Sequence, residues 1–148
     1  MAAEKRAGAN KQDAEFWRIA IEINPYLLFF VPDEYMTKEL CALAVGRKGG
    51  AIHYVPFQMR SRELYKQAVF NDFNAFAYID ENEKSEELCI IAVEQSGIAL
   101  EFVPEKFRTK EVYFAAVRNY RHMLKFVDVS KLTKEEYTEI CRLAFEGE

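Results

Sequence analysis

Apolar residues recur along the chain as adjacent pairs, each followed by a second pair four positions later. In the segment TKELCALAV, for example, the apolar residues are Leu40, Cys41, Ala44 and Val45, at positions i, i+1, i+4 and i+5. This spacing places all four on one side of an α-helix, so it predicts a short amphipathic helix with a single buried stripe. The segments SRELYKQAV, SEELCIIAV and TKEVYFAAV repeat the pattern.

The repetition has a strict period of 24 residues. Each copy begins with a Ser, Thr or Asp, and a Glu follows two residues later: the first residues are Asp13, Thr37, Ser61, Ser85, Thr109 and Thr133. These residue types cap helices, because a side-chain oxygen accepts a hydrogen bond from a first-turn amide, and the Glu favours the positive end of the helix dipole. The last copy is ambiguous, since TEICRLAF matches KELCALAV better when it is moved by four residues.

A shorter apolar segment follows each of the first five predicted helices with the same period. Each such segment ends in an aromatic residue that precedes Val or Ile: Phe30, Tyr54, Tyr78, Phe102 and Phe126. We expect a second helix of one to two turns there, which Pro32, Pro56 and Pro104 stop in three of the copies. The glycines of GRKGG and QSG are expected to end the longer helices in the left-handed conformation.

Helices this short cannot bury an apolar face alone, so neighbouring pairs must stack to form a continuous core. We therefore predict an all-α fold of tandem 24-residue helix-turn-helix repeats, stacked as a short α-solenoid with six longer and five shorter helices. The repeat domain is expected to span residues 13–148 as a single domain, after a disordered polar leader at 1–12.

Composition and charge narrow the function classes. Half of the 148 residues are hydrophobic, and the formal net charge of −4 argues against general electrostatic attraction to nucleic acid or to an anionic membrane. No apolar run approaches the roughly 18 residues that cross a bilayer, and the N-terminus lacks the apolar stretch of a signal peptide. Three widely spaced cysteines favour reduced thiols, so we predict a cytoplasmic protein.

The repeated phrase resembles a known family. Thr/Ser-x-Glu-Leu-Cys/Tyr-x-x-Ala-Val, followed by Gly-x-Ala-Leu-x-Phe-Val-Pro, is similar to a bacterial and phage-associated family of short helical repeats that is classed as a domain of unknown function. The resemblance covers residues 13–145 and implies the repeat type but no activity. Asp80 and Asp128 stand where the pattern has Pro, and Phe73 and Arg121 stand where it has Gly.

The candidate catalytic and metal-binding residues are better explained as structural ones. Cys41 and Cys89 share a repeat position two repeats apart, which is roughly 20 Å at about 10 Å between packed helices, so we expect two core thiols and no disulfide. His53 and His122 occupy different repeat positions and should not converge on a metal. Phosphate-binding loops and nucleophile elbows are absent from the sequence. We therefore expect no enzyme, no catalytic residue, no metal and no cofactor.

Two surfaces remain as candidate binding sites. Phe57, Phe70 and Phe73 stand at positions that are small or polar in most other repeats, so we predict that they contact a partner protein. Cations next to the helix N-termini could instead form an edge that binds phosphate or a carboxylate-rich ligand. The residues of this cationic edge are Arg60, Arg62, Arg108 and Lys110.

The sequence therefore supports two functional hypotheses. The first is a non-enzymatic protein-interaction module, and its size and family resemblance would suit an inhibitor or immunity-type protein of a phage or bacterial conflict system. The alternative is a binder of nucleic acid or of a phosphorylated ligand along the cationic edge, which the net negative charge disfavours. Neither hypothesis involves a membrane.

Overall fold

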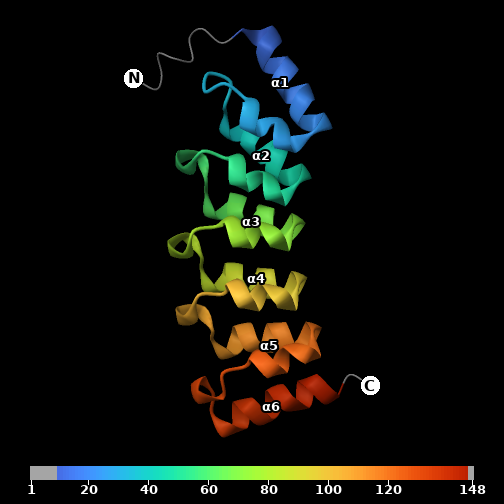
Figure 1. Cartoon of the computed structure of the whole chain (residues 1–148), viewed down its shortest axis with the longest axis vertical. Coiled ribbons are helices and arrows are strands. Elements are labelled where there is room, and N and C mark those ends of the chain that lie inside the picture. Colours follow the sequence, from blue (N-terminus) through green and yellow to red (C-terminus); the bar gives the residue numbers. More distant parts are fainter. Residues whose placement is uncertain (1–9, 147–148) are drawn as a thin grey trace. The chain divides into compact units, whose positions relative to one another are not determined.

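The computed structural model describes residues 10–146, and the regular structure in that range is entirely helical (Figure 1). There are six α-helices: α1 (Lys11–Ile23), α2 (Lys38–Arg47), α3 (Arg62–Asn71), α4 (Glu86–Gln95), α5 (Lys110–Asn119) and α6 (Lys134–Phe145). Five six-residue 3-10 helices lie between them: η2 (Pro25–Phe30), η3 (Gly49–Tyr54), η5 (Phe73–Tyr78), η7 (Gly97–Phe102) and η9 (Arg121–Phe126). The prediction of an all-α fold is confirmed for the described residues.

Further three-residue 3-10 turns precede α3, α4, α5 and α6, and the sequence did not predict them. They are η4 (Phe57–Met59), η6 (Glu81–Glu83), η8 (Glu105–Phe107) and η10 (Val129–Lys131). Pro56 and Pro104 form the N-caps of two of these turns. The fixed φ of proline sets the entry of the chain into the turn, and the other two copies begin with Asp80 and Asp128 instead.

The chain divides into two compact units, Met1–Tyr78 and Ile79–Glu148. In the first unit α2 packs against both α1 and α3, and η3 packs against α2, α3, η2 and η5, so the 3-10 helices form a second layer on the α-helices (Figure 1). In the second unit α5 packs against α4 and α6, with η7 and η9 as the second layer. The single domain over 13–148 and the continuous solenoid stay predictions.

The buried stripe that the sequence predicts is found in α2, α3, α4 and α5 at the same four positions. In α2 it consists of Leu40, Cys41, Ala44 and Val45, of which the last three are completely buried. Burying one valine side chain contributes about 1.5–3 kcal/mol, so the stripe is the main link between neighbouring helices. The alanine of each stripe lets successive helices approach closely.

The predicted helix starts are correct for five of the repeats, and four of them also form the predicted capping bond. The side chains of Thr37, Ser61, Ser85 and Thr133 each accept a hydrogen bond from a first-turn amide. Thr109 is the N-cap residue of α5, but its side chain accepts no hydrogen bond from a first-turn amide, and its hydroxyl donates to Glu86 Oε1 at 2.6 Å.

The predicted start of the first helix is wrong. Asn10 caps α1, and Asp13 lies within the first turn, where its carboxylate accepts a hydrogen bond from the Tyr35 hydroxyl at 3.0 Å. Lys11 and Gln12, the last two residues of the predicted leader, are therefore helical. Residues 1–9 of the leader lie outside the described residues.

The last repeat keeps the period at its N-cap and loses it in its buried stripe. Glu136 stands where α2, α3 and α4 have a buried leucine; its side chain accepts a hydrogen bond from the Thr133 backbone amide, and Thr133 accepts one from Glu136, which makes a capping box. Of the four stripe positions only Ile140, at the position of Ala44, is buried in α6, and the other buried residue, Ala144, lies one turn later than the period predicts. Both registers suggested by the sequence are thus used, one for the cap and one for the core.

The expected left-handed glycines are a wrong prediction. No described glycine has a positive φ, and the C-caps of α2 and α4 are the extended residues Lys48 and Ser96. The next glycine, Gly49 or Gly97, is required by close packing instead. A Cβ on Gly49 would lie 2.0 Å from the backbone oxygen of Ala68, and a Cβ on Gly97 would lie 2.6 Å from the side chain of Met123.

Gly49→Ala should destabilise the protein, because the added methyl meets backbone that cannot move without shifting α3. We expect a loss of about 1–3 kcal/mol in the free energy of unfolding, measured by urea denaturation. Gly46→Ala is the matched control: Gly46 is exposed within α2, and its nearest neighbour is the end of the flexible Gln67 side chain. This control should gain about 0.5–1 kcal/mol. Equal effects of the two substitutions would contradict the packing role of Gly49.

Tyr113→Phe should stabilise the protein. The Tyr113 side chain is completely buried in α5, and its hydroxyl has no hydrogen-bond partner among the described residues. An unsatisfied buried hydroxyl costs about 1–3 kcal/mol, so its removal should raise the unfolding free energy by about 1 kcal/mol. A loss of stability in the same urea experiment would show that the hydroxyl has a partner in solution.

Candidate functional site

A row of exposed rings crosses the 3-10 layer of the first compact unit. We call it the aromatic row, and its members are Tyr26, Phe29, Phe30, His53, Tyr54 and Tyr78. They come from three consecutive 3-10 helices, η2, η3 and η5, which places repeat-related side chains next to one another.

Ring contacts connect the whole aromatic row. The centroids of Phe29 and Phe30 are 5.1 Å apart, and those of Phe29 and Tyr54 are 5.6 Å apart. His53 lies 5.1 Å from Tyr54 and 5.0 Å from Tyr78, while Tyr26 lies 6.3 Å from Tyr54. Such contacts fall in the range of favourable edge-to-face pairs, which hold each ring in a defined orientation before any partner arrives.

The rings remain largely accessible despite these contacts. Phe29 and Phe30 keep 66% and 64% of their surface exposed, and Tyr78 keeps 52%. The fold does not need an aromatic residue at the position of Phe29, since the equivalent residues of later repeats are His53, Ala77, Glu101 and Lys125. The aromatic character of that position in η2 is therefore unexplained by packing of the repeats.

A recess opens beside the aromatic row. Its volume is about 340 Å³, and its lining includes Tyr26, Phe29, Phe30 and Tyr54, together with Asn24 and Leu27. Asn24 caps η2 through its side chain, which accepts a hydrogen bond from the Tyr26 amide at 3.1 Å. The recess is apolar on most sides and could receive one apolar side chain of a partner.

The three predicted partner-contact residues lie at the two ends of α3. Phe57 begins the turn before the helix and Phe70 is its second-last residue, with 62% and 67% of their surfaces exposed. Phe73, at the start of η5, is half-buried. A ten-residue helix is about 15 Å long, so Phe57 is separated from the other two and the three do not form one cluster. Their role as contacts stays a prediction.

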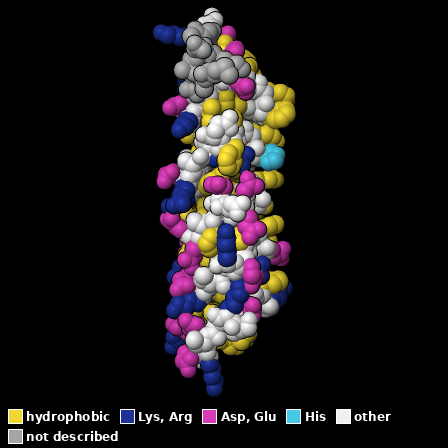
Figure 2. Space-filling model, turned by 90° about the vertical axis from the view of Figure 1, so that its left-hand side faces the viewer, with side chains coloured by type: hydrophobic (Ala, Val, Ile, Leu, Met, Phe, Trp, Pro, Cys, Tyr) yellow, Lys and Arg dark blue, Asp and Glu magenta, His cyan; other side chains and the backbone are white. Residues whose placement is uncertain are grey.

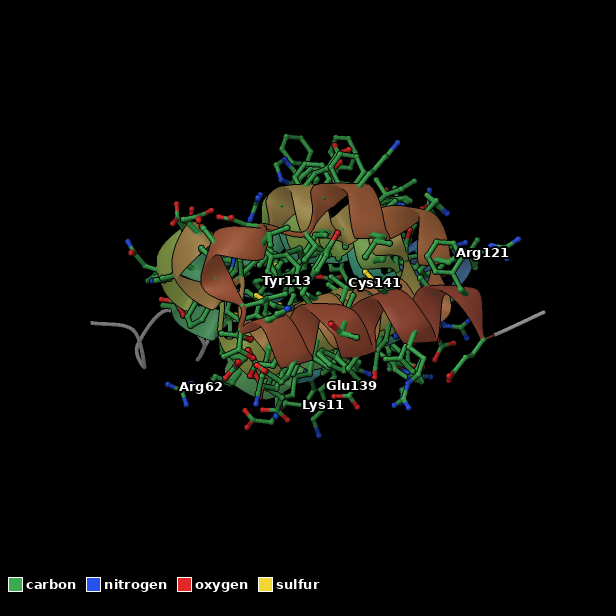
Figure 3. All side chains as sticks on the ribbon, turned by 90° about the horizontal axis from the view of Figure 1, so that it is seen from below. Lys11, Arg62, Tyr113, Arg121, Glu139 and Cys141 are labelled. Atoms are coloured by element: carbon green, nitrogen blue, oxygen red, sulfur yellow. The ribbon has the colours of Figure 1, made fainter. Side chains whose placement is uncertain are left out.

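Most of the predicted cationic edge is already engaged with the protein itself. Arg60 and Arg108, which share a repeat position, donate from Nε to the carbonyl oxygens of Val55 at 2.9 Å and Val103 at 3.1 Å. These bonds hold the turn before the next α-helix. Arg62 is exposed, as Figure 3 shows.

Lys110, the fourth member of the cationic edge, forms an ion pair within the second unit. Its Nζ lies 3.1 Å from Glu136 Oε1, which links α5 to α6. The hydrogen bond to Glu136 raises the pKa of Lys110. In turn, the Thr133 amide and then Lys110 lower the pKa of Glu136. In Figure 2 basic side chains are interspersed with acidic ones on the face shown, so this face is mixed in charge.

The cysteines are placed as core residues. Cys41 and Cys89 are completely buried, and Cys141 is half-buried between the α and 3-10 layers of the second unit, on the same side of α6 as Tyr113 (Figure 3). Burial raises the pKa of the Cys41 and Cys89 thiols to about 11. The thiolate, which is the nucleophile, is therefore scarce at these two positions near neutral pH.

Alkylation should distinguish the three thiols. With iodoacetamide at pH 8, we expect Cys141 to react first, because Cys41 and Cys89 are inaccessible and about one thousandth ionised. Peptide mass spectrometry at successive times would give the order. All three should react at similar rates in urea, and rapid labelling of Cys41 or Cys89 in the native protein would contradict their burial.

Within residues 10–146 no cluster of three or more His, Cys, Asp or Glu side chains could hold a metal ion. His53 belongs to the aromatic row, and His122 contacts Tyr120 with ring centroids 6.3 Å apart. None of the described helices combines the length and the apolar character needed to cross a membrane.

One of three comparisons with known proteins finds a match. Residues 85–132 match the family model of a domain of unknown function (DUF4116). The match begins at the N-cap Ser85 and ends one residue before the N-cap Thr133, so it spans two 24-residue periods. No curated protein and no solved structure matches the chain. The expected similarity to a family of unknown function is thus confirmed for this segment, while the bacterial or phage origin stays a prediction.

Sequence reasoning missed the aromatic row because it interpreted the repeated aromatic position as part of the packing. Phe30, Tyr54 and Tyr78 recur with the period, which is typical of core residues, yet two of them are exposed and Tyr54 is only half-buried. A useful signal was available. Phe29 precedes one of these rings and has polar or small equivalents in the later repeats.

Proposed function

We propose that the chain is a non-enzymatic protein-interaction module and that the aromatic row is its recognition surface. The observation that carries the proposal is the accessibility of connected rings that stacking of the repeats does not require, such as Phe29. Aromatic side chains are enriched among the residues that dominate binding energies, because they bury a large area at a small cost in side-chain entropy.

The geometry of the aromatic row is consistent with a partner protein that places one apolar side chain at the centre of the interface. The recess between Tyr26, Phe29 and Tyr54 could receive that side chain, and the surrounding rings would exclude water from it. The Tyr26 and Tyr54 hydroxyls and His53 provide polar groups for hydrogen bonds at the rim. Burying about 100 Å² of ring surface would contribute about 2.5 kcal/mol before the cost of association.

The alternative function, binding of nucleic acid or of a phosphorylated ligand, receives less support. It relies on Arg60 and Arg108, each of which commits its Nε to a backbone carbonyl, and on Lys110, which is paired with Glu136. A ligand would have to compete with Glu136 for Lys110, and neighbouring carboxylates would oppose it. An RNA or DNA complex that weakens steeply with salt and depends on Arg62 would favour the alternative.

The proposal includes the biological role expected from the family resemblance. We propose a cytoplasmic protein that acts as an inhibitor or immunity-type partner in a phage or bacterial conflict system, built from short stacks of 24-residue repeats. The recurrence of the N-cap position at Thr37, Ser61, Ser85, Thr109 and Thr133 supports the repeat unit. The small size of the chain suits stoichiometric binding to one target.

Phe30→Glu should abolish stoichiometric capture of the partner protein from cells that produce the chain. Loss of one dominant ring costs about 2 kcal/mol, or about 30-fold in the dissociation constant. Affinity capture with quantitative mass spectrometry would measure the recovery. Phe30 is 64% exposed, so the variant should unfold at the same urea concentration as the wild type.

Two matched variants make this experiment specific. Phe70→Glu changes a ring that is 67% exposed at the end of α3, and Phe145→Glu changes one that is 70% exposed at the end of α6. Phe145→Glu should retain the partner, whereas Phe70→Glu tests the partner contact that the sequence predicts at the end of α3. Loss of capture with Phe70→Glu alone would place the recognition surface at the end of α3. Equal capture by all variants would refute the proposal that the aromatic row is the recognition surface.

A further inference from the structure

The α-helical layer of the second compact unit contains a groove on the side opposite the 3-10 helices. Its volume is about 530 Å³, and α4, α5 and α6 all contribute to its lining. The apolar residues of the lining are Ile90, Phe114, Ala115 and Leu143. Glu139 lies on this outer side of α6, facing away from Tyr113 and Cys141 (Figure 3).

The apolar floor of this groove is not required by the fold. Ile90 and Phe114 share one repeat position, and the other residues at that position are Arg18, Ala42, Lys66 and Thr138. The first unit packs its helices with Arg, Ala and Lys there. Leu143, from α6, adds a third large apolar side chain to the floor. The second unit therefore has apolar residues at a position where the packing of the repeats also permits polar ones.

The rim of the groove is acidic. It carries four carboxylates and two cations, which gives a net charge of −2: Glu94, Glu111, Glu136, Glu139, Lys110 and Arg118. The two cations are paired with rim carboxylates, since Lys110 lies 3.1 Å from Glu136 and Arg118 lies 3.6 Å from Glu94.

Two carboxylates remain outside these pairs. Glu111 is exposed in the first turn of α5, and Glu139 forms a long ion pair with Arg142, at 3.9 Å, which is not part of the rim. A cationic ligand would meet these two carboxylates without displacing the pairs within the rim.

We propose that this groove binds a basic amphipathic helix of a partner protein. An apolar floor with a negatively charged rim is complementary to a helix whose apolar stripe is bordered by Lys or Arg. Side chains at i, i+3 or i+4, and i+7 of such a helix would contact Phe114, Ile90 and Leu143. Its flanking cations would pair with Glu111 and Glu139. This site is separate from the aromatic row, and each lies within a single compact unit.

Synthetic peptides test the proposal on the full chain. The first probe is a 16-residue helix with Leu at the stripe positions and Lys on both flanks, followed by fluorescence anisotropy. A scrambled peptide of the same composition removes the stripe, and a third peptide replaces every Lys with Glu. We expect saturable binding of the first, at least tenfold weaker binding of the scrambled peptide, and none of the acidic one.

Variants of the groove locate the binding. Ile90→Lys introduces the residue that the first unit already has at this repeat position, Lys66, so the fold should tolerate it, and we expect at least tenfold weaker binding. Glu111→Gln combined with Glu139→Gln leaves the floor intact and should weaken binding and reduce its salt dependence. Phe30→Glu in the aromatic row should leave peptide binding unchanged, which separates this inference from the proposed function.

Several results would overturn the inference. They are equal binding of the ordered and scrambled peptides, equal binding of the basic and acidic peptides, loss of binding with Phe30→Glu, and self-association of the chain through Ile90 in place of peptide binding. Absence of saturable binding below about 1 mM, which corresponds to about 4 kcal/mol, would also overturn it. Unchanged binding to a folded Ile90→Lys variant would place the helix elsewhere.

Discussion

Everything in this structure depends on the inability of a ten-residue helix to bury its apolar stripe by itself. An isolated helix of this length is marginal in water, so each helix is stable only against a neighbour. The repeat solves the problem with small residues at the contact. Ala44, Ala68, Ala92 and Ala116 are completely buried, and Gly49 leaves no space for a Cβ beside Ala68. The equivalent alanines of neighbouring helices, such as Ala44 in α2 and Ala68 in α3, are 24 residues apart in the sequence.

The same constraint determines which positions are free to vary. Residues on the stripe are apolar, with tyrosine at one position in α3 and α5, and caps are restricted to residues with a short polar side chain. The outward positions of both layers have no such restriction, since one of them accepts Arg18, Ala42, Lys66, Ile90, Phe114 and Thr138 in turn. The binding surface of a repeat protein can therefore be located by comparing equivalent positions of its repeats. An exposed apolar residue whose equivalents in other repeats are polar is a candidate binding residue.

Most of the fold could be predicted from the sequence because helix caps and buried stripes are local patterns. Thr37 and the Leu40 stripe are recognised within nine residues. The type of the shorter helices, 3-10, and the extended C-caps at Lys48 and Ser96 could not be predicted in this way. They depend on contacts with the next repeat, as Gly49 shows. A glycine after a helix is usually left-handed, but here the approach of α3 decides its role.

The candidate sites were harder to predict because exposure is a property of the assembled layers. The cations near the N-caps looked available in sequence, yet Arg60 and Arg108 hold carbonyls five residues before them, a contact that exists only once the turn is formed. The groove shows the opposite case. Phe114 and Leu143 are 29 positions apart, and only the packing of α5 against α6 brings them to one surface.

This difference explains why the two proposed surfaces have different chemistry on one scaffold. The 3-10 layer exposes a repeated aromatic position, so its surface in the first unit is a row of similar rings. The α layer exposes positions that vary from repeat to repeat, so its surface in the second unit combines single residues of different types, from Ile90 to Glu139. A row of similar rings can contact an apolar partner in several alignments. A groove that combines apolar and acidic residues requires a partner whose charges and apolar side chains have a matching spacing. The aromatic row is thus suited to supply contact area, and the groove is suited to select the partner.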